Sequence, residues 1–144
     1  MTRHLLLLSF GLFTLSTTTA SARLGETWSN CIKFYGPCKR DPNGRPSRSE
    51  KLLPDAAQAE WEYHGFQIKV AWLPPGPHGP AAMMVVTSLF KFNEDQIAKL
   101  ISLNSKGNIW KKTSETTWTR SDNSTAVLTD NGKRFVFKSA QLPP

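Results

Sequence analysis

The stretch Glu60–Leu73 reads EWEYHGFQIKVAWL and decides the fold. Aromatic residues alternate with acids before the dipeptide His64-Gly65, and bulky apolar residues alternate with polar or small ones after it. Alternation with period two on both sides of a two-residue connection is typical of a β-hairpin. The stretch therefore predicts a hairpin with one apolar face and one polar face.

The segments on either side of this hairpin extend the pattern. After the proline-rich loop at 74–80, the run AMMVVTSL at 82–89 predicts a third, largely buried strand that completes a meander. Before the hairpin, residues 39–59 are rich in proline and charge, which predicts a long loop. A loop of this length is unusual in a compact domain, so we expect it to be either functional or disordered.

Two short helices are predicted from their end signals. The first is predicted over Leu24–Tyr35, with Thr27 as a plausible N-cap and with Gly36-Pro37 ending it. The second begins after Asn93, where a glutamine three residues later completes a relative of the capping box, and it ends within 104–107.

The last third of the sequence predicts three more strands. They begin near Ile109, and the segments TTWTR at 116–120, TAVLT at 125–129 and KRFVFKS at 133–139 are rich in strand formers. Asp130-Asn131-Gly132 between the last two is a strong hairpin signal. The predicted class is therefore α+β, with two short helices packed on antiparallel β-meanders in the order α-βββ-α-βββ.

The N-terminal residues 1–22 have the order of a secretory signal peptide. Arg3 provides a basic start, Leu5–Leu15 is mostly apolar, and Ala20-Ser21-Ala22 offers small residues for cleavage after Ala22. The apolar run is too short to span a bilayer. We therefore expect a secreted or periplasmic protein, with a single domain at 23–144 and no transmembrane segment after cleavage.

The charge balance is strongly basic, with a net charge of +7 in a chain of 144 residues. Only Arg3 of these charges lies in the expected leader. A basic protein outside the cytoplasm fits an unknown envelope protein or anionic polymer as partner, with plain solubility as the alternative. Nucleic acid is not an expected partner in that compartment.

The two cysteines, Cys31 and Cys38, are predicted to form a structural disulfide, because exported chains meet oxidising conditions. The alternative is two packed thiols, since Cys31 also falls on the apolar face of the first helix. The spacing does not fit a C-x-x-C redox pair or the usual zinc patterns. No metal site and no cofactor are expected.

No set of residues predicts a catalytic site. Glu60 and Glu62 alternate on one strand, as acids on a solvent-facing side do, and His64 lies in the predicted turn. The expected catalytic residues are therefore none, and we expect a protein that is not an enzyme.

A candidate binding surface comes from tryptophans beside basic residues. It comprises Trp110, Lys111, Lys112, Trp118 and Arg120, which could face carbohydrate or lipid. The alternative is that the tryptophans pack in the core, because they mostly fall on the apolar side of the alternation.

The order of these motifs resembles a known family. Gly25, Thr27, Tyr35 and Gly36-Pro37, followed by Trp61, Tyr63 and Phe66, resemble the SmpA/OmlA-type outer-membrane assembly lipoproteins and the β-lactamase-inhibitor-like fold over Leu24–Leu89. The whole chain is also similar to uncharacterised exported bacterial proteins. The resemblance implies a helix followed by a meander, and no activity can be carried over from these proteins.

These observations predict an exported, non-enzymatic binding or scaffolding module of the cell envelope whose ligand is unknown. The alternatives are a proteinaceous inhibitor of an exported enzyme, suggested by the resemblance, and a small hydrolase with an unrecognised site.

Overall fold

The structure is a computed structural model that describes residues 23–40, 42–44, 49–74, 76 and 78–142. The predicted signal peptide at 1–22 lies outside these residues, as do parts of the predicted loop at 39–59. No helix in the described part of the chain is long and apolar enough to cross a lipid bilayer.

The predicted hairpin and meander are confirmed. Strands β1 (Ala57–Tyr63), β2 (Phe66–Trp72) and β3 (Ala81–Thr87) pair antiparallel in sequence order. The turn residues His64 and Gly65 have φ values of 49° and 82°. Two successive residues with positive φ give the backbone twist that a two-residue hairpin requires. Because β1 begins at Ala57, the prediction that the loop extends to residue 59 is wrong by three residues, which have strand geometry.

The second half of the chain adds four strands where three were predicted. These are β4 (Trp110–Lys112), β5 (Thr117–Arg120), β6 (Thr125–Thr129) and β7 (Arg134–Lys138), and the turn η1 (Asp130–Gly132), whose residues all have positive φ, lies inside the predicted last hairpin. The additional strand is β4, whose three residues are too few to show an alternating pattern in the sequence.

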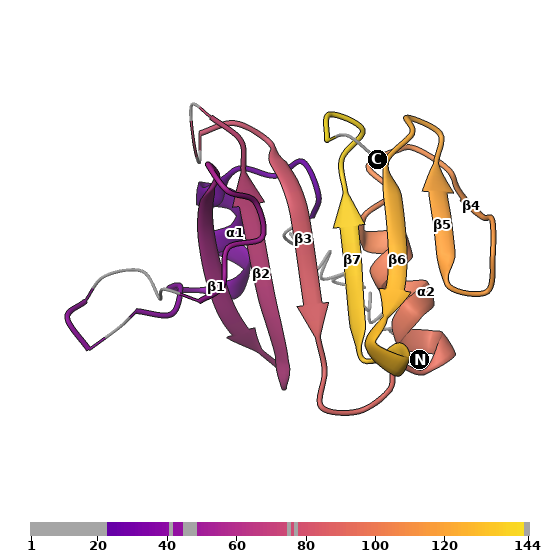
Figure 1. Cartoon of the computed structure of the whole chain (residues 1–144), viewed down its shortest axis with the longest axis horizontal. Coiled ribbons are helices and arrows are strands. Elements are labelled where there is room, and N and C mark those ends of the chain that lie inside the picture. The colour runs from indigo at the N-terminus through magenta and orange to yellow at the C-terminus, as the bar shows by residue number, and fades with distance from the viewer. Residues whose placement is uncertain (1–22, 41, 45–48, 75, 77, 143–144) are drawn as a thin grey trace, which may run out of the picture.

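All the strands form one antiparallel sheet rather than two separate meanders. The strand order is β1-β2-β3-β7-β6-β5-β4, so β7 lies between β3 and β6 (Figure 1). Val86 of β3 is directly opposite Phe135 of β7, and Met84 is opposite Phe137. These buried apolar pairs join the two halves of the chain at the centre of the sheet.

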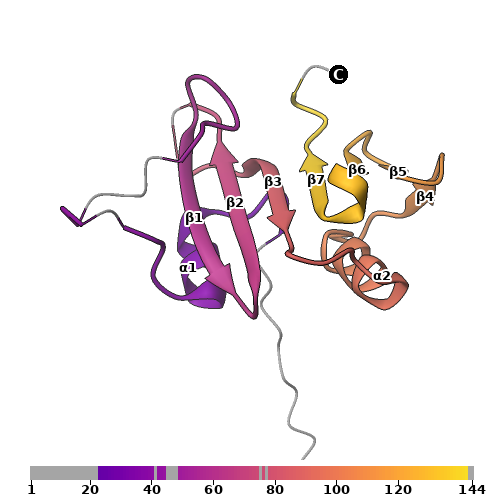
Figure 2. The ribbon, with the colours of Figure 1, turned by 60° about the horizontal axis from the view of Figure 1, so that its bottom comes forward.

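Both predicted helices are present and lie on the same side of the sheet (Figure 2). Helix α1 (Trp28–Tyr35) has Thr27 as N-cap, whose hydroxyl accepts a hydrogen bond from the Asn30 amide. Helix α2 (Glu94–Leu103) begins with a complete capping box between Asn93 and Gln96. Satisfied N-terminal amides fix where each helix starts.

The main core lies between this face of the sheet and the two helices. Its most deeply buried large side chains are Trp61 and Trp72 from the first half and Phe135 and Phe137 from the second, each at most 1% exposed. The indole Nε1 of Trp61 donates to the Gly36 carbonyl at 2.9 Å, and that of Trp72 donates to the Glu26 carbonyl at 3.0 Å. These two hydrogen bonds hold both ends of α1 against the sheet.

A smaller apolar cluster covers part of the opposite face. Ala71, Met83 and Val85 are buried there beneath Leu52, Leu53 and other apolar residues. The side chain of Gln58 accepts a hydrogen bond from the Leu52 amide at 2.8 Å. The segment at 49–56 is thus attached to the sheet by side-chain contacts.

Candidate functional site

A groove of about 480 Å³ lies on the helix side of the sheet, between α1 and α2. Its floor is formed by Phe66 and Ile68 of β2 and by Met84 and Val86 of β3. The other lining residues come from the two helices, the β1–β2 turn and the strand end beside it: Phe34, Tyr35, Tyr63, His64, Gln96, Lys99, Leu100, Leu103 and Asn104. A concave site of this size and apolar character is typical of small-molecule binding sites.

The wall on the α1 side is a cluster of packed aromatic rings. The centroids of Tyr35 and Tyr63 are 5.1 Å apart in an edge-to-face arrangement, and Phe34 contacts both rings at 4.8 and 5.2 Å. Burial raises the pKa of Tyr35 above its usual value, with smaller effects from Cys31 and Tyr63. The Tyr35 hydroxyl therefore stays neutral at physiological pH, and the wall presents rings without charge.

The charge in the groove comes from Lys99, among the described residues that line it. Lys99 lies on α2 and His64 lies in the hairpin turn, both exposed, while Gln96 and Asn104 provide neutral polar groups. Among the described residues that line the groove there is no carboxylate and no serine, threonine or cysteine. The groove can therefore attract an anionic group at its rim.

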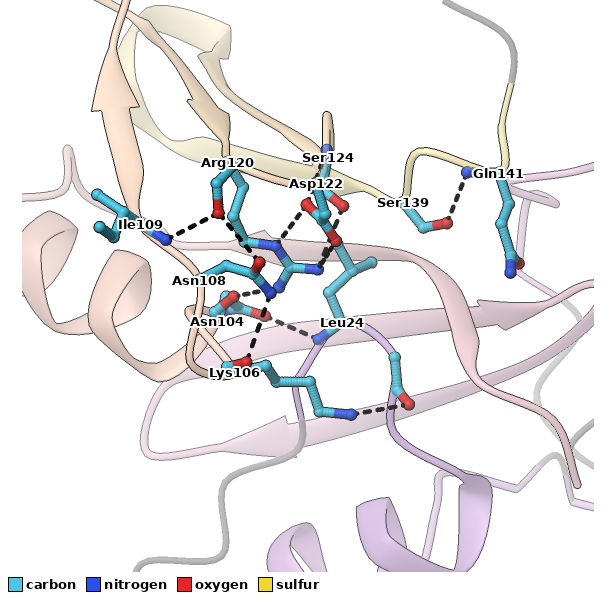
Figure 3. A network of polar contacts seen from close by, with 12 residues as sticks. Leu24, Asn104, Lys106, Asn108, Ile109, Arg120, Asp122, Ser124, Ser139 and Gln141 are labelled. Carbon is cyan, nitrogen blue, oxygen red and sulfur yellow. Dashed lines mark hydrogen bonds and ion pairs between the residues drawn. The ribbon is translucent and has the colours of Figure 1, made fainter.

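One end of the groove is fixed by a polar network around Asn104 (Figure 3). The Asn104 side chain accepts a hydrogen bond from the Leu24 amide at 2.8 Å and donates to the Leu100 carbonyl at 2.9 Å. Its backbone carbonyl accepts a hydrogen bond from Arg120 at 2.6 Å. Asn104 thereby joins the end of α2 to the segment before α1 and to the end of β5.

Arg120 is the centre of this network and is only 6% exposed. Its guanidinium donates to both carboxylate oxygens of Asp122, at 2.9 and 2.6 Å, and to the hydroxyl of Ser124 at 3.2 Å. These bonds from Arg120 hold the pKa of Asp122 well below its usual range. A residue that the sequence suggested for binding is thus a structural cation.

The five residues predicted as a binding surface do not form one exposed patch. Trp118 is 8% exposed and packs edge-to-face on Phe135, with ring centroids 5.3 Å apart. The guanidinium carbon of Arg120 lies over the Trp110 ring, 5.5 Å from the ring centroid. Lys112 lies over the Trp118 ring at 5.4 Å, whereas Lys111, its neighbour in the strand, points to the opposite face. Only the two lysines are exposed.

Glu60 was predicted to be a surface acid, but the residue is buried, with 8% of its surface exposed. The segment around Lys39 runs beside β1, and the Lys39 amide donates to the Glu60 carbonyl at 2.7 Å. Glu62 stays exposed and forms an ion pair with Lys39 at 3.4 Å. A long-range backbone contact of this kind has no local signal in the sequence.

The two cysteines are unbonded and buried in the structure. The predicted Cys31–Cys38 disulfide is therefore not formed there, and it stays a prediction. Burial, aided by the charge of Glu26, raises the pKa of the Cys31 thiol to about 12. A thiol with this pKa contains almost no reactive thiolate at neutral pH.

We expect Cys31 in the folded, reduced protein to resist alkylation by iodoacetamide at pH 8 and to react readily in guanidinium chloride. Intact mass and peptide mapping before and after unfolding would measure this. Rapid modification of Cys31 in the folded protein would contradict the burial described here. A chain that lacks a pair of hydrogens, and that takes up no label even when unfolded, would instead establish the disulfide.

His64, the histidine of the predicted turn, is placed against an aromatic ring. His64 packs its ring edge-to-face on Tyr63 at 4.2 Å. In the described part of the chain, no group of three or more histidine, cysteine or acidic residues is placed to hold a metal ion.

The fold and the groove together define a class: a helix-covered antiparallel sheet with an apolar groove between its helices. Comparison with protein-family models, curated proteins and solved structures gives no match for this chain. The resemblance to the SmpA/OmlA-type proteins therefore stays a prediction.

Proposed function

We propose that the protein is an exported, non-enzymatic binding module that holds a single-chain amphiphile in the groove between α1 and α2. The apolar part of the ligand lies on the floor formed by β2 and β3. An anionic head group, such as a carboxylate or a phosphate, lies at the rim beside Lys99.

The observation that carries this proposal is the composition of the groove. Its floor is built from apolar side chains alone, and one wall is a cluster of aromatic rings. Such a surface gains free energy by covering an apolar ligand, and it offers few polar partners to a sugar or a peptide backbone. Since the charged side chain among the described lining residues is Lys99, an anionic amphiphile fits better than a cationic one.

Binding can be tested with dansyl-labelled undecanoic acid, whose fluorescence increases when its label leaves water. We expect saturable binding to the purified exported protein. Leu103→Trp, which fills the groove from α2, should weaken binding at least about tenfold, because bulk in a shaped apolar site excludes the ligand. The matched control is Ala98→Trp, an exposed position of the same helix that does not line the groove.

The role of charge is tested by Lys99→Gln and by the uncharged amide of the same probe. Lys99→Gln should weaken binding of the acid probe several-fold and leave binding of the amide probe unchanged, since only the acid carries the charge that interacts with Lys99. Equal binding by Leu103→Trp and the unsubstituted protein would place the probe elsewhere and refute the groove as the site.

A further inference from the structure

The loop between β3 and α2 carries the most exposed large apolar side chains in the described part of the molecule. Leu89 is 81% exposed and Phe90 is 79% exposed, and they are adjacent in the sequence. We call this pair the apolar tip. Two neighbouring side chains of this size in water cost free energy, because their apolar surface remains hydrated.

Backbone contacts hold this loop in place at both ends. The Ser88 amide donates to the Lys133 carbonyl at 2.9 Å, and the Phe92 amide donates to the Gly132 carbonyl at 2.8 Å. Within the loop, the Phe90 amide donates to the Ser88 hydroxyl at 3.2 Å. The exposure of the tip is therefore a feature of an anchored loop rather than of a free end.

The tip lies at the same end of the sheet as one end of the groove. Strands β1 and β3 run in the same direction, so the His64-Gly65 turn and the loop after β3 share the lower end in Figure 1. Phe92, which directly follows the loop, stacks on the groove residue Phe66 with ring centroids 5.7 Å apart. The groove residue Gln96 belongs to the first turn of α2, at this same end.

We propose that Leu89 and Phe90 insert into the surface of a lipid bilayer and place this end of the groove against the membrane. The inference rests on the proposed function, because a groove for amphiphiles next to a membrane contact could take up its ligand there. A convex pair of apolar side chains suits insertion between lipids, where no complementary pocket is needed.

The charge around the tip is mixed. Lys91 and Lys133 flank it, while Glu94, Asp95 and Asp130 lie at the same end. The apolar side chains must therefore provide most of the affinity. The net charge of the whole chain is +7, or +6 once Arg3 is removed with the predicted leader, and it adds a weaker, longer-range attraction to anionic head groups.

Co-sedimentation with vesicles of phosphatidylglycerol and phosphatidylcholine tests the proposal. We expect the exported protein to bind, and we expect the double variant Leu89→Ser/Phe90→Ser to bind at least about tenfold more weakly. The matched control is Ile109→Ser, which removes an apolar side chain of 76% exposure at the other end of the sheet and should leave binding unchanged.

A second measurement follows insertion directly. A nitrobenzoxadiazole label on Phe90→Cys should show a blue-shifted, brighter emission with vesicles, and the same label on Ile109→Cys should not. No vesicle binding by the unsubstituted protein would overturn the proposal. The proposal would also be overturned if the double variant bound vesicles as tightly as the unsubstituted protein. This includes the case in which added salt abolishes the binding of both proteins, because that binding would be electrostatic. A soluble protein partner that is captured only when Leu89 and Phe90 are intact, without vesicle binding, would assign the tip to protein recognition and also overturn it.

The two proposals fail separately. The tip variants should retain binding of the soluble dansyl probe, since neither residue lines the groove. Loss of vesicle binding with intact probe binding therefore supports the tip and leaves the groove standing. If Leu103→Trp bound both vesicles and the probe as the unsubstituted protein does, the proposal of ligand binding in the groove would be refuted and the proposal for the tip would stand.

Discussion

Replacement of Asp122 by alanine is expected to reduce the free energy of unfolding by about 3 kcal/mol, because it leaves the buried cation of Arg120 without its counter-charge. Arg120 is 6% exposed and makes two of its hydrogen bonds to the Asp122 carboxylate. The Asp122 side chain is 38% exposed, which places the expected loss at the lower end for buried ion pairs. Urea denaturation of the variant and the unsubstituted protein measures the difference.

A double variant separates the lost charge pair from general damage. Arg120→Met together with Asp122→Ala removes both charges, so we expect it to be more stable than Asp122→Ala alone by more than about 1 kcal/mol. A double variant that is less stable than Asp122→Ala would show that the remaining bonds of Arg120, to Asn104 and Ser124, matter more than its unpaired charge.

The same ion pair predicts sensitivity to acid. The pKa of Asp122 is lowered in the folded protein, so its contribution to stability is fully present above the unfolded value of about 4 and is lost as the pH falls toward the folded value. The free energy of unfolding should therefore decrease more steeply below about pH 4 in the unsubstituted protein than in Asp122→Asn. Parallel curves for the two proteins would contradict the assignment.

Replacement of Trp61 by alanine is the second change expected to have a large effect, at about 4 kcal/mol of unfolding free energy. The side chain is 1% exposed and packs against Tyr35 and Trp72, with ring centroids 5.5 and 6.5 Å away. The variant loses this packing together with the hydrogen bond to Gly36 at the end of α1. Chemical denaturation, followed by far-ultraviolet circular dichroism, reports the change.

A matched pair of phenylalanine variants isolates the hydrogen bond. Trp61→Phe removes an indole N–H that donates at 2.9 Å, whereas the buried Nε1 of Trp110 has no hydrogen-bond partner among the described residues. We therefore expect Trp61→Phe to cost at least about 1 kcal/mol more than Trp110→Phe. Equal costs would mean that ring size alone determines the stability at both positions.

The elements that could be predicted from the sequence are those with local signals. The hairpin follows from alternation around His64-Gly65, whose observed positive φ values suit such a turn. Both helices follow from their end signals, since Thr27 and Asn93 act on amides only three residues away. Contacts of this kind join residues that are close in the sequence, so they can be predicted from it.

The features that escaped prediction depend on contacts between distant segments. Strand β4 exists because Trp110–Lys112 pair with β5, and the two halves become one sheet because β7 pairs with β3. Arg120 is buried because Asp122 and the carbonyl of Asn104 surround it. Its sequence neighbourhood, with tryptophans and lysines, is equally compatible with an exposed patch.

The groove could not be predicted for the same reason. Its floor comes from β2 and β3, but its existence depends on α1 and α2 covering different parts of one face of the sheet. The lining residues are ordinary members of apolar stripes, and nothing in those stripes distinguishes a residue beneath a helix from one between two helices.

The position of β7 has a consequence for biogenesis. Among the described strands, β7 is the last to be synthesised, and it is the one that lies between β3 and β6, so the sheet cannot be completed before β7 is available. Before that moment, β3 retains an unpaired edge, and the phenylalanines of β7 are not yet available to close the interior. Until β7 has been synthesised, such a chain therefore carries an open sheet edge that can pair with another chain.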